Sequence, residues 1–150
     1  MEVYRIAEEN FSNELTASGL ANRWNNDNQF VLYTGSSRSL ATLELVVARK
    51  SINPKSNYRV MIISIADEEE LFTAVLKNNL PEDWRSTNSY SQLQQIGSDW
   101  YKSSQSLVLK VPSAVISQEY NYLINTKHPD FATKVSLVRT ENYFWDERLV

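Results

Sequence analysis

The chain of 150 residues contains no cysteine, one histidine and three glycines, and each shortage argues against a class of site. Without cysteine there can be no disulfide and no thiolate metal site. A lone histidine, His128, argues against a zinc or multi-histidine centre, so we expect no metal cofactor. Gly19, Gly35 and Gly97 are too far apart to form a Rossmann turn or a P-loop. If the protein binds a nucleotide, arginine side chains must therefore hold its phosphates.

The overall composition is that of a globular protein, with 42% hydrophobic and 22% charged residues. We expect one domain over residues 1–150, long enough to bury about 68–70% of its unfolded surface. The net charge of −3 and the scattered basic residues argue against nucleic acid as a direct partner. No apolar run approaches about 18 residues and the start of the chain lacks a signal-peptide pattern, so we expect no membrane segment and a cytoplasmic protein.

Residue patterning predicts an α+β fold, with a mixed β-sheet core and helices inserted among the strands. Strands are predicted at residues 3–7, 30–34, 58–66, 106–111, 134–138 and 143–145. The run at 58–66 is almost continuously apolar, so this strand is expected to be central. Helices are predicted at residues 39–50, with Ser37 or Ser39 as N-cap, and at 90–103. Residues 68–76 fit a short helix or an irregular excursion, and residues 115–132 are expected to be irregular.

Glu44 stands out because helical periodicity places it within the apolar face of the helix at 39–50. The other members of that face are predicted to be Leu40, Ala41, Leu43, Val46, Val47 and Ala48. An ionised carboxylate on a core-facing surface is costly unless it is paired or hydrogen-bonded. Either Glu44 faces a cavity or it has a partner, for which the candidates are Arg23, Arg38 and Arg49.

Three other side chains admit both a structural and a functional interpretation. Arg23 is a surface charge or a phosphate clamp, and Tyr33 is a core aromatic or a stacking surface for a flat heterocycle. Ser113 belongs to a turn or acts with a base, but His128 has no visible orienting partner, which disfavours a Ser-His hydrolase. We interpret the tryptophans as core and loop anchors: Trp24, Trp84, Trp100 and Trp145.

Ten short pieces, in order along essentially the whole chain, together resemble the RES domain family, which is named for its Arg, Glu and Ser. The pieces are Val3-Tyr4-Arg5-Ile6, Arg23-Trp24-Asn25, Val31-Leu32-Tyr33-Thr34, Ser39-Leu40-Ala41-Thr42-Leu43-Glu44, Leu80-Pro81-Glu82-Asp83-Trp84, Ile96-Gly97-Ser98-Asp99-Trp100, Val111-Pro112-Ser113-Ala114, Glu119-Tyr120-Asn121-Tyr122-Leu123-Ile124-Asn125, His128-Pro129-Asp130-Phe131 and Asp146-Glu147-Arg148-Leu149. The family commonly has glycine before the Arg-Trp pair, where this chain has Asn22.

The resemblance implies a bacterial toxin of a type II toxin–antitoxin system, with an ADP-ribosyltransferase-like fold and NAD as its substrate. Some members of the family release nicotinamide to water or phosphate, and others pass ADP-ribose to a protein, so the acceptor stays open. The usual antitoxin is an Xre-type helix-turn-helix protein that covers the active-site cleft of the toxin and represses the operon. A homodimer within a larger toxin–antitoxin complex is compatible with this arrangement.

By resemblance, the catalytic and NAD-binding residues are Arg23, Tyr33, Glu44 and Ser113. Asn121 and His128 are expected to contact these residues and not the substrate. Cleavage of the nicotinamide–ribose bond passes through an oxocarbenium-like state, which a carboxylate can stabilise. We therefore expect Glu44 to bind the ribose 2′-OH, Tyr33 to stack on nicotinamide and Arg23 to hold the pyrophosphate. Ser113 would position the ribose or the attacking nucleophile.

Two other functions remain open at this point. An ADP-ribosyltransferase would leave a modified protein instead of free ADP-ribose. A catalytically inactive module, retained for partner binding, would not deplete NAD at all.

Overall fold

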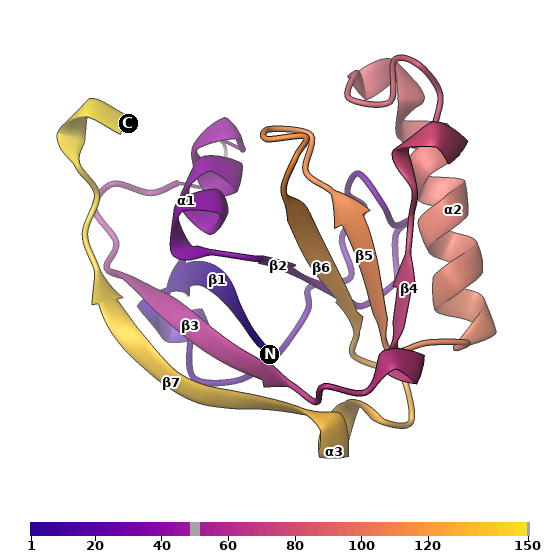
Figure 1. Cartoon of the computed structure of the whole chain (residues 1–150). Helices are drawn as coiled ribbons and strands as arrows, with labels where there is room; N and C mark the ends of the chain where they lie inside the picture. The colour runs from indigo at the N-terminus through magenta and orange to yellow at the C-terminus, as the bar shows by residue number, and fades with distance from the viewer. Residues whose placement is uncertain (49–51, 150) are drawn as a thin grey trace.

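The computed structural model describes residues 1–48 and 52–149, which form an α+β fold on a seven-stranded sheet (Figure 1). The strands are β1 (Glu2–Glu8), β2 (Val31–Gly35), β3 (Tyr58–Ile65), β4 (Phe72–Ala74), β5 (Val108–Pro112), β6 (Tyr120–Asn125) and β7 (Val135–Tyr143). The helices are α1 (Arg38–Val47), α2 (Tyr90–Ser103) and α3 (Phe131–Lys134). The predicted α+β class is confirmed, and the sheet is compatible with an ADP-ribosyltransferase-like fold.

The strands lie in the order β4-β5-β6-β2-β1-β3-β7. β4 and β5 run parallel and the other neighbouring pairs are antiparallel, so the sheet is mixed as predicted. The apolar run at 58–66 forms β3, which lies between β1 and β7. It is therefore an interior strand, although not the middle strand of the sheet.

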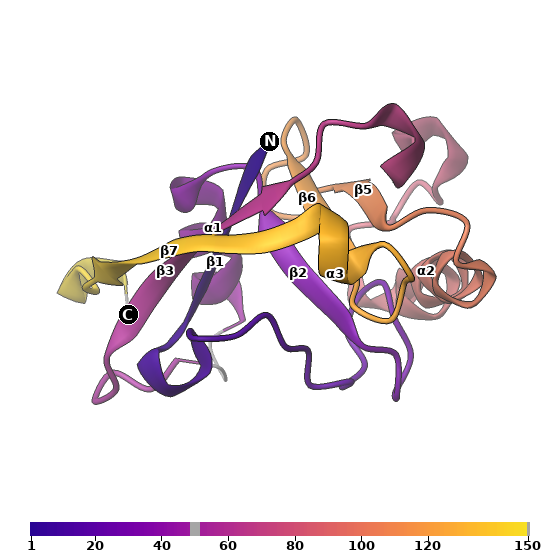
Figure 2. The same ribbon diagram turned by 90° about the horizontal axis from the view of Figure 1, so that it is seen from below.

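The sheet nearly divides between β1 and β2, which are joined by the single register pair of Tyr4 with Gly35. By contrast, β1 pairs with β3, and β2 with β6, along their full lengths. Beyond Tyr4 and Gly35 the two strands diverge, so that β1-β3-β7 and β2-β6-β5-β4 form two half-sheets (Figure 1, Figure 2). The candidate site lies at the gap between them.

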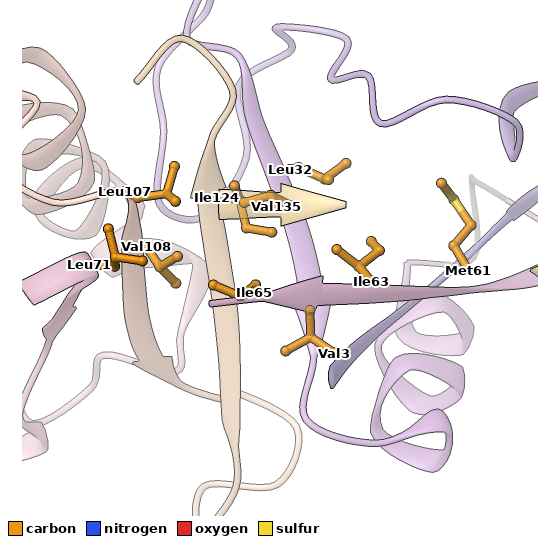
Figure 3. Packing of buried hydrophobic residues seen from close by; sticks show 10 residues of the cluster. All are labelled: Val3, Leu32, Met61, Ile63, Ile65, Leu71, Leu107, Val108, Ile124 and Val135. Atoms are coloured by element: carbon orange, nitrogen blue, oxygen red, sulfur yellow. The ribbon is translucent and has the colours of Figure 1, made fainter. Parts of the chain in front are cut away.

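Apolar side chains from both half-sheets pack together in one cluster (Figure 3). This cluster consists of Val3, Leu32, Met61, Ile63, Ile65, Leu71, Leu107, Val108, Ile124 and Val135. β3 contributes to it with one face, while its other face, with Val60 and Ile62, packs beneath α1. Burial on both faces explains why this strand reads as a continuous apolar run.

Helix α1 packs on the half-sheet of β1 and β3 through Ala41 and Leu45. Its N-cap is Ser37, whose Oγ accepts a hydrogen bond from the backbone N–H of Leu40. Val47, which we expected on the buried face, is 65% exposed, so that face is rotated toward Leu45. The helix ends at Val47, and its predicted end at Lys50 lies outside the described residues.

Helix α2 matches the prediction at residues 90–103 and covers the other half-sheet. Its Leu93 and Trp100 pack with a cluster that also contains Trp24, Trp84, Val31, Leu109, Val111 and Leu123. Trp145 packs instead near α1, edge-on to Tyr58 and Tyr143. The interpretation of the tryptophans as anchors is thus confirmed. Within the described residues, no helix is both long and apolar enough to cross a membrane.

Three stretches differ from the prediction. Residues 115–132, expected to be irregular, contain β6, which pairs with both β2 and β5. Asn121 and Asn125 interrupt its apolar pattern because their side chains make specific hydrogen bonds to Glu44 and Tyr101. The stretch at 68–76 forms a 3₁₀ turn and then the short strand β4. The two strands predicted at 134–138 and 143–145 are a single edge strand, β7. Its residues 139–142 are polar, so the sequence pattern did not show that the strand is continuous.

Gly97 allows α2 to lie directly on the loop that carries Arg23. A Cβ atom at position 97 would lie 1.6 Å from the backbone oxygen of Trp24. Gly97→Ala should therefore lower the free energy of unfolding by at least about 1–3 kcal/mol, although alanine favours helices. Urea unfolding measures this, with the exposed Ser91→Ala as the control. Equal stability of Gly97→Ala and wild type would contradict the close packing.

Candidate active site

A cleft of about 1120 Å³ opens where β1 and β2 diverge. Its walls come from β1, β2, α1, the segment 17–24 and the connection between β5 and β6. Three of the four residues predicted to be catalytic, Arg23, Tyr33 and Glu44, line this cleft, together with Asn121. The fourth, Ser113, lies directly behind the wall formed by its neighbours Pro112 and Ala114.

Glu44 is held by two hydrogen bonds that converge on one carboxylate oxygen. The hydroxyl of Ser113 and the side-chain amide of Asn121 each donate to Glu44 Oε1 at 2.7 Å. Oε2 has no hydrogen-bond partner among residues 1–48 and 52–149. Glu44 therefore has the partner that its place on the helix demands, and still presents one free oxygen in the cleft.

Ser113 is fully buried, and its hydroxyl makes three hydrogen bonds. Its hydroxyl donates to Glu44 and accepts from the backbone N–H groups of Val115 and Ile116 at 3.0 and 3.1 Å. Its own backbone N–H donates to the carbonyl of Glu119 at 2.9 Å. In this arrangement Ser113 positions a carboxylate and has no free lone pair with which to attack a substrate.

Asn121 reaches Glu44 from the start of β6, where it stands opposite Gly35 of β2 and Val111 of β5. Its amide nitrogen must face the carboxylate, because the amide oxygen would repel it. Asn121 Oδ1 is consequently buried without a hydrogen-bond partner in the described part of the chain. Gly35 lets the first turn of α1 lie close to β2, since a Cβ there would lie 3.2 Å from the backbone nitrogen of Ala41.

The hydroxyl of Tyr33 is hydrogen-bonded to the loop that carries Arg23. Its hydroxyl donates to Asn25 Oδ1 at 2.5 Å and accepts from the backbone N–H of Trp24 at 3.2 Å. Burial raises the pKa of Tyr33, so the hydroxyl stays protonated at neutral pH. With the hydroxyl occupied in the loop, Tyr33 can offer the cleft only its ring.

Arg23 is held in place by hydrogen bonds to backbone carbonyls of the segment 84–85. Its Nη1 donates to the carbonyls of Trp84 and Arg85 at 3.3 and 3.2 Å, and its guanidinium lies 4.8 Å from the ring centre of Tyr90. No ion pair joins Arg23 to a carboxylate in the described ranges, so the idea that Arg23 neutralises Glu44 is wrong.

The other arginines considered as partners of Glu44 do not pair with it either, as far as the structure describes them. Arg38 forms a bidentate pair with Glu141 at 2.9 Å, which ties the start of α1 to β7. Arg49 lies outside the described residues. The hydrogen bonds of Ser113 and Asn121 take the place of an ion pair at Glu44.

Asn22, which stands where the family commonly has glycine, forms part of a tight turn. Its side-chain oxygen accepts from the backbone N–H of Arg23 at 2.8 Å, and its backbone bridges to Asn25. Asn22 is not among the residues with positive φ, so no glycine is required for this backbone conformation. Helix α2 also stabilises this turn, because its Gln94 donates to the Asn22 carbonyl at 2.8 Å.

The sequence interpretation missed two arginines that line the same cleft, Arg5 and Arg85. Arg5 Nη1 donates to the Tyr33 carbonyl at 3.1 Å across the gap between β1 and β2, and burial lowers the pKa of Arg5. Arg85 Nε donates to the Ala114 carbonyl at 2.8 Å. Strand alternation places Arg5 on the apolar face with Val3, a signal like that at Glu44. No comparable signal marks Arg85, which lies in a loop.

His128 is not brought to the cleft. It follows the far end of β6, where Nε2 lies 3.0 Å from the Ser104 carbonyl and Nδ1 accepts from the backbone N–H of Asp130 at 3.0 Å. It joins the end of α2 to the turn before α3 and makes no hydrogen bond to Ser113 in the described part of the chain. His128 therefore has no contact through which it could support Glu44.

As far as the structure describes the chain, the cleft combines a carboxylate with one unbonded oxygen and guanidinium groups that donate only to backbone carbonyls. Such a surface suits a ligand that carries an anionic group and a centre where positive charge develops nearby. Within residues 1–48 and 52–149 there is no group of three or more His, Cys, Asp or Glu side chains placed to hold a metal ion.

Comparison with known proteins gives a match to the family model described as RES domain over residues 2–146. "Toxin Res" of Yersinia enterocolitica is 33% identical over 127 residues, which cover 85% of this chain and 82% of that protein. "Prs ADP-ribosylating toxin" of a Sphingobium species is 33% identical over 129 residues, 85% of this chain and 80% of the relative. "Toxin Res" of Photorhabdus laumondii is 30% identical over 128 residues, 85% and 81% respectively.

Tyr33→Phe tests the role of the hydroxyl. It should lower the free energy of unfolding at pH 7 by about 1–3 kcal/mol, because the Trp24 N–H and Asn25 lose a buried partner. Tyr33 remains protonated in the folded state, whereas the unfolded state ionises near the ordinary value of 10.0. Its stabilisation is therefore present below pH 10 and shrinks as the pH rises further.

Urea unfolding between pH 7 and 11 measures this difference between wild type and Tyr33→Phe. Tyr120→Phe is the control, because the Tyr120 hydroxyl makes no hydrogen bond among the described residues. A gap between wild type and Tyr33→Phe that stays constant up to pH 11 would contradict the buried, protonated hydroxyl.

Proposed function

Because the chain belongs to the RES domain family, we propose that it is a toxin that consumes NAD by cleaving the bond between nicotinamide and ribose. The observation that carries the proposal is the state of Glu44. One carboxylate oxygen is fixed by Ser113 and Asn121, and the other is free in a cleft lined by arginines. Three relatives are named as toxins, one of them as ADP-ribosylating, which supports NAD as the substrate.

The chemistry requires little more than a well-placed negative charge. When the C1′–N bond breaks, its electron pair passes to the pyridinium nitrogen, so nicotinamide leaves as a neutral molecule and needs no general acid. The ribose is left with oxocarbenium character, which a nearby carboxylate stabilises. Attack by water at C1′ then gives ADP-ribose and releases one proton. Phosphate would give ADP-ribose 1-phosphate by the same route.

Each residue of the site has a role in this scheme. Glu44 Oε2 accepts a hydrogen bond from the ribose 2′-OH and stabilises the positive charge at C1′. The ring of Tyr33 flanks the nicotinamide, and the free guanidinium nitrogens of Arg23 bind the pyrophosphate. Ser113 and Asn121 act by fixing the carboxylate of Glu44.

ADP-ribosylation of a protein is the second candidate function. The printed name of the Sphingobium relative favours it. So does the rim of the cleft, where Phe11, Leu20 and Val47 are 68%, 72% and 65% exposed although they are large and apolar. Exposed apolar groups around a cleft suit contact with a protein, either an acceptor or an antitoxin that covers the site.

Expression of the chain alone in a bacterium should lower cellular NAD and stop growth. Enzymatic NAD measurement and mass spectrometry of total protein follow the two outcomes in the same culture. Free ADP-ribose, or its 1-phosphate, would support the cleavage reaction. Arrest with unchanged NAD and an ADP-ribosylated protein would instead establish the transferase, and unchanged NAD with normal growth would indicate an inactive module.

Glu44→Gln should reduce the rate of nicotinamide release at least about 10²-fold, because it removes the charge that stabilises the transition state. The glutamine oxygen can still accept from Ser113 and Asn121, so the fold should persist. The amide nitrogen then replaces Oε2 and cannot accept from a ribose hydroxyl.

Steady-state release of nicotinamide by the purified proteins provides the measurement. The exposed Glu14→Gln is the matched control and should turn over like wild type. Normal turnover by folded Glu44→Gln protein would show that the carboxylate is structural.

A further inference from the structure

We propose that Arg85 is a second phosphate-binding residue, which forms a two-arginine clamp with Arg23 around the diphosphate of the substrate; this rests on the proposed function. Neither sequence pattern nor ion pairing marks Arg85. The inference comes from how the two side chains are anchored and from what they leave free.

Both arginines are tied to the same short segment of backbone. Arg23 Nη1 donates to the carbonyls of Trp84 and of Arg85 itself at 3.3 and 3.2 Å. Arg85 Nε donates to the Ala114 carbonyl at 2.8 Å, next to Ser113. Trp84, only 7% exposed, packs in the cluster under α2 and holds this segment in place. Each guanidinium group is therefore anchored to backbone carbonyls, and both residues line the cleft.

The anchoring leaves several donors unused. Among residues 1–48 and 52–149, Arg85 bonds through Nε, so both of its terminal nitrogens remain, and Arg23 bonds through Nη1 alone. Both residues line the cleft that contains Glu44. A guanidinium with two parallel N–H groups matches two oxygens of a phosphate. Two such groups on one wall offer separate ligands for the two phosphates of a diphosphate.

The charges support the same occupant. Neither Arg23 nor Arg85 forms an ion pair within the described ranges, whereas Arg38, Arg139 and Arg148 each pair with a carboxylate. Two cations that line one cleft without a carboxylate partner among the described residues repel each other, and an anion that binds both removes that cost. The chain carries a net charge of −3 and no glycine-rich phosphate loop, so an uncompensated positive wall is not a consequence of a basic composition.

A purely structural role for Arg85 makes a different prediction. Its hydrogen bond to the Ala114 carbonyl could serve only to hold the β5–β6 connection, on which Ser113 lies. Arg85→Gln separates the two roles, because the amide nitrogen of glutamine occupies the position of Nε along the side chain and can still donate to that carbonyl. Arg85→Met removes both the hydrogen bond and the charged group.

Titration calorimetry with ADP-ribose and with adenosine tests the clamp. Arg85→Gln and Arg85→Met should both weaken ADP-ribose binding by about 10–100-fold, as expected for lost hydrogen bonds to a charged group, and leave adenosine binding unchanged. In turnover, Arg85→Gln should raise KM for NAD while kcat stays within a few-fold. Arg148→Gln, which removes an exposed arginine paired with Asp146, is the control and should match wild type.

Two results would overturn the clamp itself. Wild-type affinity in Arg85→Gln with a loss in Arg85→Met would assign Arg85 a structural role. An equal loss for adenosine and ADP-ribose would indicate general damage to the cleft. Failure of the proposed function is distinguishable from both, because the wild-type protein would then neither release nicotinamide from NAD nor bind ADP-ribose.

Discussion

The fixed carboxylate of Glu44 is the interaction on which the rest of the site depends. A charged group on the inner side of α1 needs partners, and the chain supplies them from positions far away in sequence, Ser113 and Asn121. Three elements must therefore meet at one point: helix α1, the end of β5 and the start of β6. Because both donors use the same oxygen, the need for stability is met while the other oxygen remains available for chemistry.

The second constraint is the division of the sheet between β1 and β2. The gap gives the cleft its position, and side chains replace the missing ladder, with Arg5 donating to the Tyr33 carbonyl across it. The far wall is held by packing: Tyr33 fastens the loop of Arg23, and that loop lies against α2 at Gly97. Core packing and the wall that carries Arg23 are thus parts of one structure.

Local patterns predicted the elements that obey a single period. The apolar run of β3 and the amphipathic helix α2 were found, and so was Glu44, because a charge on an apolar helical face violates that period. Strand β6 was missed since Asn121 serves the site and so interrupts the alternation. Arg85 could not be found from sequence, because it lies in a loop and its contact with Ala114 joins residues 29 positions apart. His128 was included through resemblance alone, and it lies elsewhere.

A double-mutant cycle on Ser113 and Glu44 tests the central claim most directly, with the initial rate of nicotinamide release from NAD as the readout. If Ser113 acts only by holding the Glu44 carboxylate, Ser113→Ala should slow the wild-type enzyme markedly. The same change should have almost no further effect in Glu44→Gln protein. Equal, additive losses in both backgrounds would contradict the account, because Ser113 would then act on the substrate independently of Glu44.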